Sequence, residues 1–253
     1  MVPAISEGDA LFLDFDGTLV EIAPSPESVM VGRELPQLLA RAAQRLEGAV
    51  AVISGRALDD LLAMLRPFAG AAAGIHGLER RTADGRLIRA ATGDLVAEAR
   101  EMLAAFAAAT PGVRLEDKGA ALALHFRARP DAAFACLKIA HDAAKRAQSR
   151  LVVIQGKMVV ELRPREANKG SAILAFLSEP PFLGRRPIFI GDDRTDEDGF
   201  AVVNRVGGIA IHVGTPGTTA APFQLPDVAA VITWIAEFAP PPRLPEPQLP
   251  LSS

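Results

Sequence analysis

Cysteine is nearly absent from this sequence, since Cys136 is the only one among 253 residues. A single cysteine cannot form a disulfide within the chain, which agrees with a reducing cytoplasm as the compartment. Free cysteines are commonly small buried apolar residues, so we expect that role for Cys136 and not the role of a nucleophile. The prediction is a cytoplasmic protein without an internal disulfide.

Long apolar runs and a basic leader are also missing. Acidic residues interrupt the longest apolar stretches, so none is long enough to cross a bilayer. Residues 1–9 carry no basic side chain and do not resemble a signal peptide. We therefore expect no membrane association.

A strong excess of one charge is absent too. The chain has 27 basic and 30 acidic residues, interspersed along its length, and a formal net charge of −3. This balance argues against nucleic-acid binding through a broad basic surface. A small anionic substrate would therefore need a local positive site.

Both ends of the chain alternate between strand and helix patterns. A length of 253 residues with 49% hydrophobic residues suits one large domain, or a core with a smaller insert. Outside the middle segment the predicted strands and helices, in chain order, are 10–13, 34–46, 49–53, 57–65, 168–177, 187–190, 208–213 and 228–238. The alternation predicts an α/β fold with a Rossmann-like, doubly wound parallel sheet.

The middle of the chain has a different pattern. A hairpin is predicted at 80–89 around Asp84-Gly85. The helices and strands expected after it are 92–109, 113–116, 121–127, 131–148, 151–154 and 158–162. The helix at 131–148 is amphipathic, with Phe134 and Leu137 on its apolar face. This antiparallel pattern predicts an α+β insert.

The predicted domain boundaries follow from this change of pattern. We expect the core to comprise 1–96 and 167–239, and the insert to comprise 97–166. Residues 240–253 are rich in proline and predict an extended or disordered tail.

Polar residues stand where three predicted strands end. They are Asp14 and Asp16, Ser54 and Arg56, and Asp192 and Asp193. Ligands of open parallel sheets bind beside the carboxyl ends of the strands, so we expect these residues to meet in one crevice. Asp14 and Asp16 are separated by one residue and point to the same side of an extended chain. Two adjacent carboxylates are unfavourable without a positive partner, and Mg²⁺ is the candidate.

These groups predict phosphoryl chemistry. A carboxylate can attack a metal-held phosphate to form an aspartyl-phosphate, while a neighbouring acid protonates the leaving oxygen and later activates water. Lys169 and Ser54 would neutralise and orient the phosphoryl oxygens. Glu197 and Asp198 have a simpler explanation, because acids in the first turn of a helix stabilise its dipole.

Four segments resemble the ordered motifs of the haloacid dehalogenase phosphohydrolase superfamily. They are Asp14-Phe15-Asp16-Gly17-Thr18-Leu19, Ser54-Gly55-Arg56, Asn168-Lys169-Gly170 and Gly191-Asp192-Asp193-Arg194-Thr195-Asp196-Glu197. The resemblance implies that the core has the fold of that superfamily and that the insert is its cap domain. It also implies the role of each motif residue.

By this resemblance, Asp14 is the nucleophile and Asp16 is the general acid and base. Ser54, Gly55, Arg56 and Lys169 are implied phosphate contacts, although the residues alone leave a structural ion pair open for Arg56. Asp14, Asp16, Asp192 and Asp193 are the implied Mg²⁺ site, to which Asp16 contributes its backbone carbonyl. Asp196 is expected to brace Lys169 from behind.

The sequence is similar, more narrowly, to trehalose-6-phosphate phosphatases over all but the tail. The residues that carry this likeness are Gly74-Ile75-His76-Gly77-Leu78-Glu79, Leu115-Glu116-Asp117-Lys118, His125-Phe126-Arg127 and Val160-Glu161-Leu162-Arg163-Pro164. The family pattern assigns sugar binding to Glu116, Lys118 and Glu161, with His76 as a further contact. Phe126 departs from the tyrosine common in the family, which removes a hydroxyl and leaves the packing.

The resemblance implies a Mg²⁺-dependent phosphatase that releases trehalose and phosphate. A phosphatase of another sugar phosphate, such as sucrose phosphate, is the nearer alternative, and a phosphomutase or a catalytically silent regulatory module are more distant ones. The residues leave His76 open between a structural and a binding role, and His125 could face the cleft. We expect a small sugar phosphate as substrate, a trehalose-6-phosphate synthase as pathway neighbour, and a monomer or weak oligomer.

Overall fold

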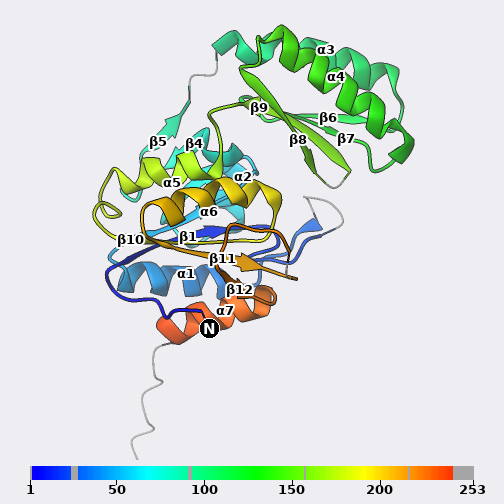
Figure 1. The fold of residues 1–253 in the computed structure, drawn as a ribbon. Helices are drawn as coiled ribbons and strands as arrows, with labels where there is room; N and C mark the ends of the chain where they lie inside the picture. The colour runs from blue at the N-terminus through cyan, green and yellow to red at the C-terminus, as the bar shows by residue number, and fades with distance from the viewer. Residues whose placement is uncertain (1, 24–27, 91–92, 157, 216, 242–253) are drawn as a thin grey trace, which may run out of the picture.

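The chain forms two sheets, a large one and a small one, in the computed structural model (Figure 1). The structure describes residues 2–23, 28–90, 93–156, 158–215 and 217–241. The predicted proline-rich tail lies outside these residues, except for its first two positions. None of the helices in the described ranges combines the length and apolar composition that crossing a bilayer requires.

The large sheet has eight strands in the order β12-β11-β10-β1-β2-β3-β4-β5. The strands are β1 (Asp9–Asp14), β2 (Val50–Ile53), β3 (Ala71–Gly74), β4 (Glu79–Arg81), β5 (Leu87–Arg89), β10 (Arg186–Gly191), β11 (Ile209–Val213) and β12 (Phe223–Leu225). Neighbours from β12 to β3 pair in parallel, whereas β4 and β5 form an antiparallel hairpin. The hairpin predicted around Asp84-Gly85 is confirmed.

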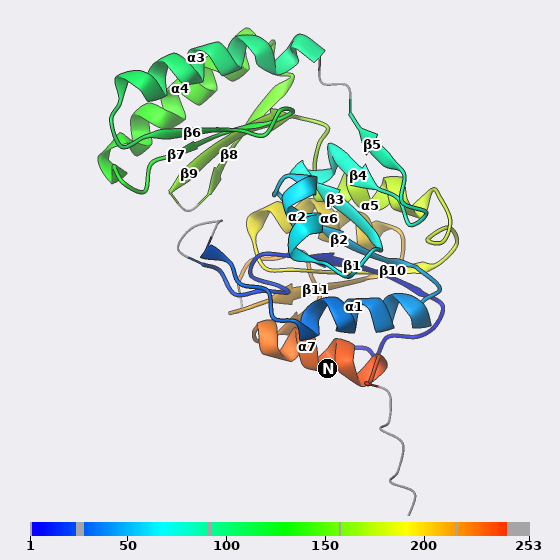
Figure 2. The same ribbon diagram turned by 180° about the vertical axis from the view of Figure 1, so that it is seen from behind.

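Helices cover both faces of the large sheet. α1 (Glu34–Arg45) and α7 (Val228–Phe238) lie on one face, and α5 (Lys169–Leu177) and α6 (Glu197–Arg205) on the other (Figures 1 and 2). α2 (Leu58–Met64) connects β2 to β3. From β1 the chain winds outward through β2, and from β10 it winds the opposite way through β11, so right-handed crossovers put the helices on opposite faces. The doubly wound prediction is confirmed.

Burial and residue type explain which strands could be predicted from the sequence. Every residue of β1 and β2 is buried, and parallel strands covered on both faces appear as continuous apolar runs. Phe12 of β1 stacks on Phe182, with ring centroids 5.3 Å apart, in the core beneath the helices. β3 was not predicted because its Ala-Ala-Ala-Gly sequence has weak strand propensity, although all four residues are buried.

The small sheet has four antiparallel strands in the order β6-β7-β9-β8. They are β6 (Arg114–Asp117), β7 (Leu122–His125), β8 (Leu151–Gly156) and β9 (Val159–Pro164). α3 (Ala97–Ala109) and α4 (Ala133–Arg146) cover the face that points away from the large sheet (Figure 2). Leu122, Leu124 and Leu162 pack with these helices in a separate buried cluster. The alternate residues of the strands therefore face the large sheet.

One prediction about α4 was wrong. Phe134, placed on the apolar face of that helix, is 79% exposed. The buried face is made of small residues instead, namely Cys136, Ala140, Ala143 and Ala144. α4 packs closely against α3 and the sheet, so small side chains fit where a phenylalanine does not. The buried position predicted for Cys136 is confirmed.

Candidate active site

The predicted site residues meet at the carboxyl ends of three adjacent strands, β10, β1 and β2. Here the chain turns outward in opposite directions, which is where doubly wound sheets bind ligands. A cavity of about 700 Å³ lies between this edge and the small sheet. Its lining includes Asp14, Asp16, Ser54, Gly55, Arg56, His76, Lys169 and Asp193 from the large sheet, and Glu116, Lys118 and Glu161 from the small one. The cavity has the size of a small-molecule site.

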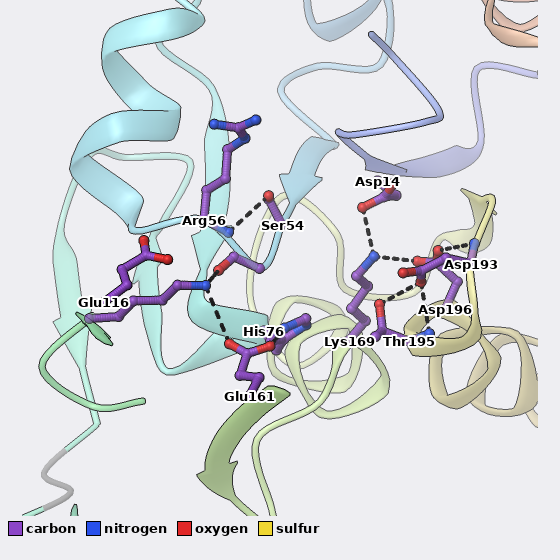
Figure 3. A network of polar contacts seen from close by, with 12 residues as sticks. Asp14, Ser54, Arg56, His76, Glu116, Glu161, Lys169, Asp193, Thr195 and Asp196 are labelled. Atoms are coloured by element: carbon purple, nitrogen blue, oxygen red, sulfur yellow. Dashed lines mark hydrogen bonds and ion pairs between the residues drawn. The ribbon is translucent and has the colours of Figure 1, made fainter. Parts of the chain in front are cut away.

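Lys169 is a buried cation between two carboxylates (Figure 3). Asn168 caps α5 by accepting a hydrogen bond from the backbone N–H of Ser171, so the helix begins at Lys169. Lys169 Nζ donates to Asp14 Oδ1 and to Asp196 Oδ1, both at 2.6 Å. Burial favours the neutral amine, but Asp14 and Asp196 outweigh it and raise the pKa of Lys169 well above its ordinary value. Lys169 is therefore charged at neutral pH.

Three carboxylates form a group that fits a divalent cation. Oxygens of Asp14, Asp192 and Asp196 lie within 4.8 Å of one another. Asp14 Oδ2 and Asp192 Oδ1 are buried and have no hydrogen-bond partner among the described residues. Burial and the nearby charge of Asp14 raise the pKa of Asp192 to about 8, and burial also raises that of Asp14. A hard cation with oxygen ligands would satisfy the unpaired oxygens and offset the repulsion.

Asp196 is tied to its neighbours through both carboxylate oxygens. Oδ1 accepts from Lys169, and Oδ2 accepts from the backbone N–H groups of Asp192 and Asp193 at 3.1 and 3.0 Å. Gly191 makes room for it, because a Cβ there would lie 2.2 Å from Asp196 Cγ. Asp196 is thus placed to brace Lys169 and the turn after β10, and the free oxygens of the group belong to Asp14 and Asp192.

Asp193 lies apart from this group of oxygens. It precedes the short helix η5 (Arg194–Asp196), and its Oδ1 accepts from the backbone N–H and hydroxyl of Thr195, both at 2.7 Å. Although burial opposes ionisation, Lys169 and these hydrogen bonds lower the pKa of Asp193. The carboxylate acts here as a helix cap, so its predicted place among the metal ligands has no support from the three-oxygen group.

Asp16 forms an ion pair with Arg56. Arg56 Nε and Nη2 donate to the two carboxylate oxygens of Asp16 at 2.7 and 2.6 Å. The Arg56 guanidinium carbon also lies 5.5 Å from the ring centroid of Phe15. Of the two roles left open for Arg56, the structure shows the ion pair, and the residue still lines the cavity.

Two small residues allow the strand ends to come this close. Gly17 has φ +88°, and a Cβ there would lie 2.1 Å from Asp192 Oδ2, so glycine lets Asp192 approach Asp14. Ser54 is buried and its Oγ accepts from the backbone N–H of Arg56 at 3.1 Å.

A chain of polar contacts crosses from the large sheet to the small one (Figure 3). Lys118 Nζ donates to the carbonyl of Gly55 at 2.9 Å and to Glu161 Oε1 at 3.4 Å. Glu161 Oε2 lies 3.1 Å from His76 Nε2. Burial opposes ionisation of Glu161, but Lys118 and His76 hold its pKa far below the usual range. Glu161 is therefore ionised and held between Lys118 and His76.

His76 is held in a left-handed conformation, with φ +54°. Such values are uncommon outside glycine and cluster at functional sites. The helix η2 (Ile75–Gly77) that contains it is tied to the loop after β2, because the backbone N–H of His76 donates to Ser54 O at 3.0 Å. The histidine thus links Glu161 to the predicted phosphate loop.

Glu116 occupies the other wall of the cavity. Its Oε2 lies 2.7 Å from His125 Nε2, and this contact lowers the pKa of Glu116. Arg114 and Arg127 line the cavity as well, and Arg194 contributes from the large sheet. No role was predicted for these arginines. In the predicted strands at 113–116 and 121–127, Arg114 lies two residues before Glu116 and Arg127 two residues after His125, so alternation places each on the same face as its neighbour.

Comparisons with known proteins agree with this site. The family model described as trehalose-phosphatase matches residues 12–228. The chain is 47% identical over 208 residues to a probable trehalose-phosphate phosphatase of Sinorhizobium fredii, covering 82% of this chain and 78% of the relative. It is 42% identical over 238 residues to the trehalose-6-phosphate phosphatase of Escherichia coli, covering 92% and 87%.

A solved structure extends the agreement to the fold. The crystal structure of a trehalose-6-phosphate phosphatase related protein superposes with a TM-score of 0.76 and 26% identity, covering 91% of this chain and 97% of that one. The resemblance and fold predicted from the sequence are confirmed, as is the class of enzyme, a phosphoric monoester hydrolase. The chain belongs to the trehalose-phosphatase family.

Proposed function

We propose that this protein hydrolyses trehalose 6-phosphate to trehalose and phosphate, with Mg²⁺ as cofactor. One observation carries the proposal: a single cavity joins the acidic group around Asp14 to the charged residues Glu116, Lys118 and Glu161 of the small sheet. The first set suits a phosphate ester, and the second suits a ligand rich in hydroxyl groups. The chain's membership of the trehalose-phosphatase family supports the choice of sugar.

Mg²⁺ would be held by Asp14 and Asp192, with the backbone carbonyl of Asp16, and when bound it would neutralise charge on the phosphoryl oxygens. Asp14 Oδ2 is the unpaired oxygen of the nucleophile, since Oδ1 accepts from Lys169. It attacks phosphorus, the bond to the sugar oxygen breaks, and an aspartyl-phosphate forms. Lys169 stays protonated and balances charge on the transferring group.

Asp16 would move the proton. As an acid it protonates the departing sugar oxygen, and as a base it takes a proton from the water that hydrolyses the aspartyl-phosphate. Two hydrogen bonds from Arg56 fix the orientation of the Asp16 carboxylate. Binding of the substrate would replace part of this contact. Ser54, Gly55 and Arg56 are the proposed phosphate contacts beside Lys169.

The small sheet would select the substrate as a cap over residues 97–166. Glu116, Lys118 and Glu161 face the large sheet across the cavity, where a disaccharide presents only hydroxyl and ether oxygens. His76 would fix Glu161 from the opposite side. A trehalose-6-phosphate synthase would supply this substrate.

Phosphate release from a panel of esters tests the proposal. The panel comprises trehalose 6-phosphate, sucrose 6-phosphate, glucose 6-phosphate and p-nitrophenyl phosphate, each with Mg²⁺ and with a chelator. We expect the highest kcat/KM for trehalose 6-phosphate and no turnover under chelation. A higher kcat/KM for another sugar phosphate would reject the assigned sugar, and full activity with the chelator would reject the cofactor.

A further inference from the structure

We propose that His125 is a positioning residue that holds Glu116 in the orientation that binds the sugar. The inference rests on the proposed function, because it assumes that Glu116 contacts the substrate. It adds a histidine to the residues that determine specificity.

The strand register brings the two side chains together. Arg114 pairs with His125, and Glu116 pairs with Ala123 on the neighbouring strand. Glu116 and His125 are thus diagonal neighbours on the same face, within reach of long and aromatic side chains. Alanine at 123 leaves the space in front of Glu116 open, and the imidazole fills it to place Nε2 2.7 Å from Glu116 Oε2.

The contact has a defined direction. Hydrogen bonding to His125 lowers the pKa of Glu116, so the carboxylate is ionised at neutral pH and can only accept. His125 Nε2 therefore carries the hydrogen. One lone pair of Oε2 is used, and the remaining acceptor sites of Glu116 are left for hydroxyl groups in the cavity.

Glu116 has one hydrogen-bond partner among the described residues, whereas Glu161 has two. Glu161 is fixed by both Lys118 and His76, and 13% of its side chain is exposed. Glu116 is 34% exposed, and His125 is its hydrogen-bond partner among the described residues. An unrestrained glutamate would sample several rotamers, and binding would then have to select one of them. The histidine removes that cost before the sugar arrives.

Packing alone does not account for His125. Leu122 and Leu124 of the same strand fill the buried cluster under α3 and α4, whereas His125 faces the cavity. Its ring is 21% exposed on that side. The position therefore calls for a donor directed at Glu116.

Two substitutions of His125 distinguish the effect of its N–H donor from the effect of its bulk. His125→Leu keeps similar bulk and removes the donor, whereas His125→Gln keeps an N–H near the position of Nε2. For His125→Leu we expect kcat/KM on trehalose 6-phosphate to fall about tenfold, mainly through KM, as for the loss of one hydrogen bond to a charged group. Turnover of p-nitrophenyl phosphate should be unchanged, and His125→Gln should restore most of the loss. His141→Leu, at an exposed histidine of α4, is the matched control.

A double-mutant cycle with Glu116→Ala tests the positioning role of His125 separately from the sugar-binding role of Glu116. We expect Glu116→Ala to lower kcat/KM for trehalose 6-phosphate selectively, and adding His125→Leu to cause no further loss. If Glu116→Ala causes no selective loss, Glu116 does not bind the sugar. A selective loss there with wild-type behaviour in His125→Leu would overturn the positioning role. Equal losses of His125→Leu on both substrates, without rescue by glutamine, would also overturn it.

Discussion

The two carboxylate oxygens of Asp14 lie in different surroundings. Oδ1 accepts from Lys169, and Oδ2 is buried with no hydrogen-bond partner among the described residues. Lys169 thus neutralises charge at one oxygen, while the other is not engaged by a protein donor in the described part of the chain. A buried ammonium beside the nucleophile also lowers the charge that the phosphate meets on entry.

Replacing Asp14 with asparagine should abolish phosphate release from every ester in the panel, because an amide cannot form the phosphoryl bond. The fold should remain, since the amide has the same shape and Lys169 keeps its contact with Asp196. Phosphate release and the circular dichroism spectrum measure the two effects. Substantial turnover by the folded variant would show that Asp14 is not the nucleophile.

Replacing Glu161 with alanine should impair sugar recognition and leave the phosphoryl chemistry intact. Loss of a charge-assisted contact is worth about 1.5–3 kcal/mol, so kcat/KM for trehalose 6-phosphate should fall by about 10- to 150-fold. Turnover of p-nitrophenyl phosphate should change little. Glu98→Ala, which removes an exposed partner of Arg146, is the control. Equal losses on both esters would argue against the sugar-binding role.

At the scale of elements, α5 connects Lys169 to the packing of the helices. Asn168 sets where α5 begins, and Gly170 lets it approach α6. A Cβ on Gly170 would lie 2.5 Å from the carbonyl oxygen of Asp198 and 2.8 Å from Val202 Cγ2. The position of Lys169 therefore depends on a close contact between two helices.

Gly170→Ala should destabilise the protein. The overlap falls on backbone, and such overpacking costs about 1–3 kcal/mol, offset in part by the higher helix propensity of alanine. We expect the free energy of unfolding, measured in urea, to fall by about 1–2 kcal/mol, and phosphate release to fall with it. Gly8→Ala is the matched control, since nothing lies within 4 Å of its Cβ. Equal stability of the two variants would contradict the close packing of α5 and α6.

At the scale of the whole molecule, the site belongs to both sheets. The large sheet supplies the group of carboxylates, and the small sheet reaches it through Lys118 to Gly55 and through Glu161 to His76. The contacts join the proposed sugar-binding residues to the loop proposed to bind phosphate. A substrate with a phosphate and a sugar would thus contact both sheets at once, whereas p-nitrophenyl phosphate, which has no sugar, would contact only the large sheet.

Mg²⁺ should stabilise the whole fold as well as support turnover. At a concentration 100 times Kd, binding contributes about 2.7 kcal/mol, which corresponds to a rise of about 5–10 °C in the unfolding temperature. A chelator should reverse the rise, and Asp192→Asn should remove most of it because the negative charge of one of the two carboxylates with a free oxygen is lost. Asp131→Asn, at an exposed acid, should keep it. An undiminished shift in Asp192→Asn would place the cation elsewhere.

The sequence by itself determined most of the elements and the candidate residues of the site. Continuous apolar runs identify β1, β2 and β10, and polar residues mark their ends, because buried parallel strands and strand-end ligands leave local patterns. The alternation in β6, β7 and β9 likewise separates cavity residues from core residues. These features depend on a few neighbours along the chain, so they can be read from it.

Only the tertiary structure decided how those residues pair. The order β10-β1-β2 brings Asp14 and Asp192 together, the ion pair to Asp16 decides between two roles for Arg56, and the cross-strand contact gives His125 a partner. The capping contact of Asp193 and the exposed position of Phe134 also follow from packing. Each outcome depends on which groups come within about 3–5 Å after packing, and that distance is set by strand order, helix contact and burial, none of which is local in the sequence.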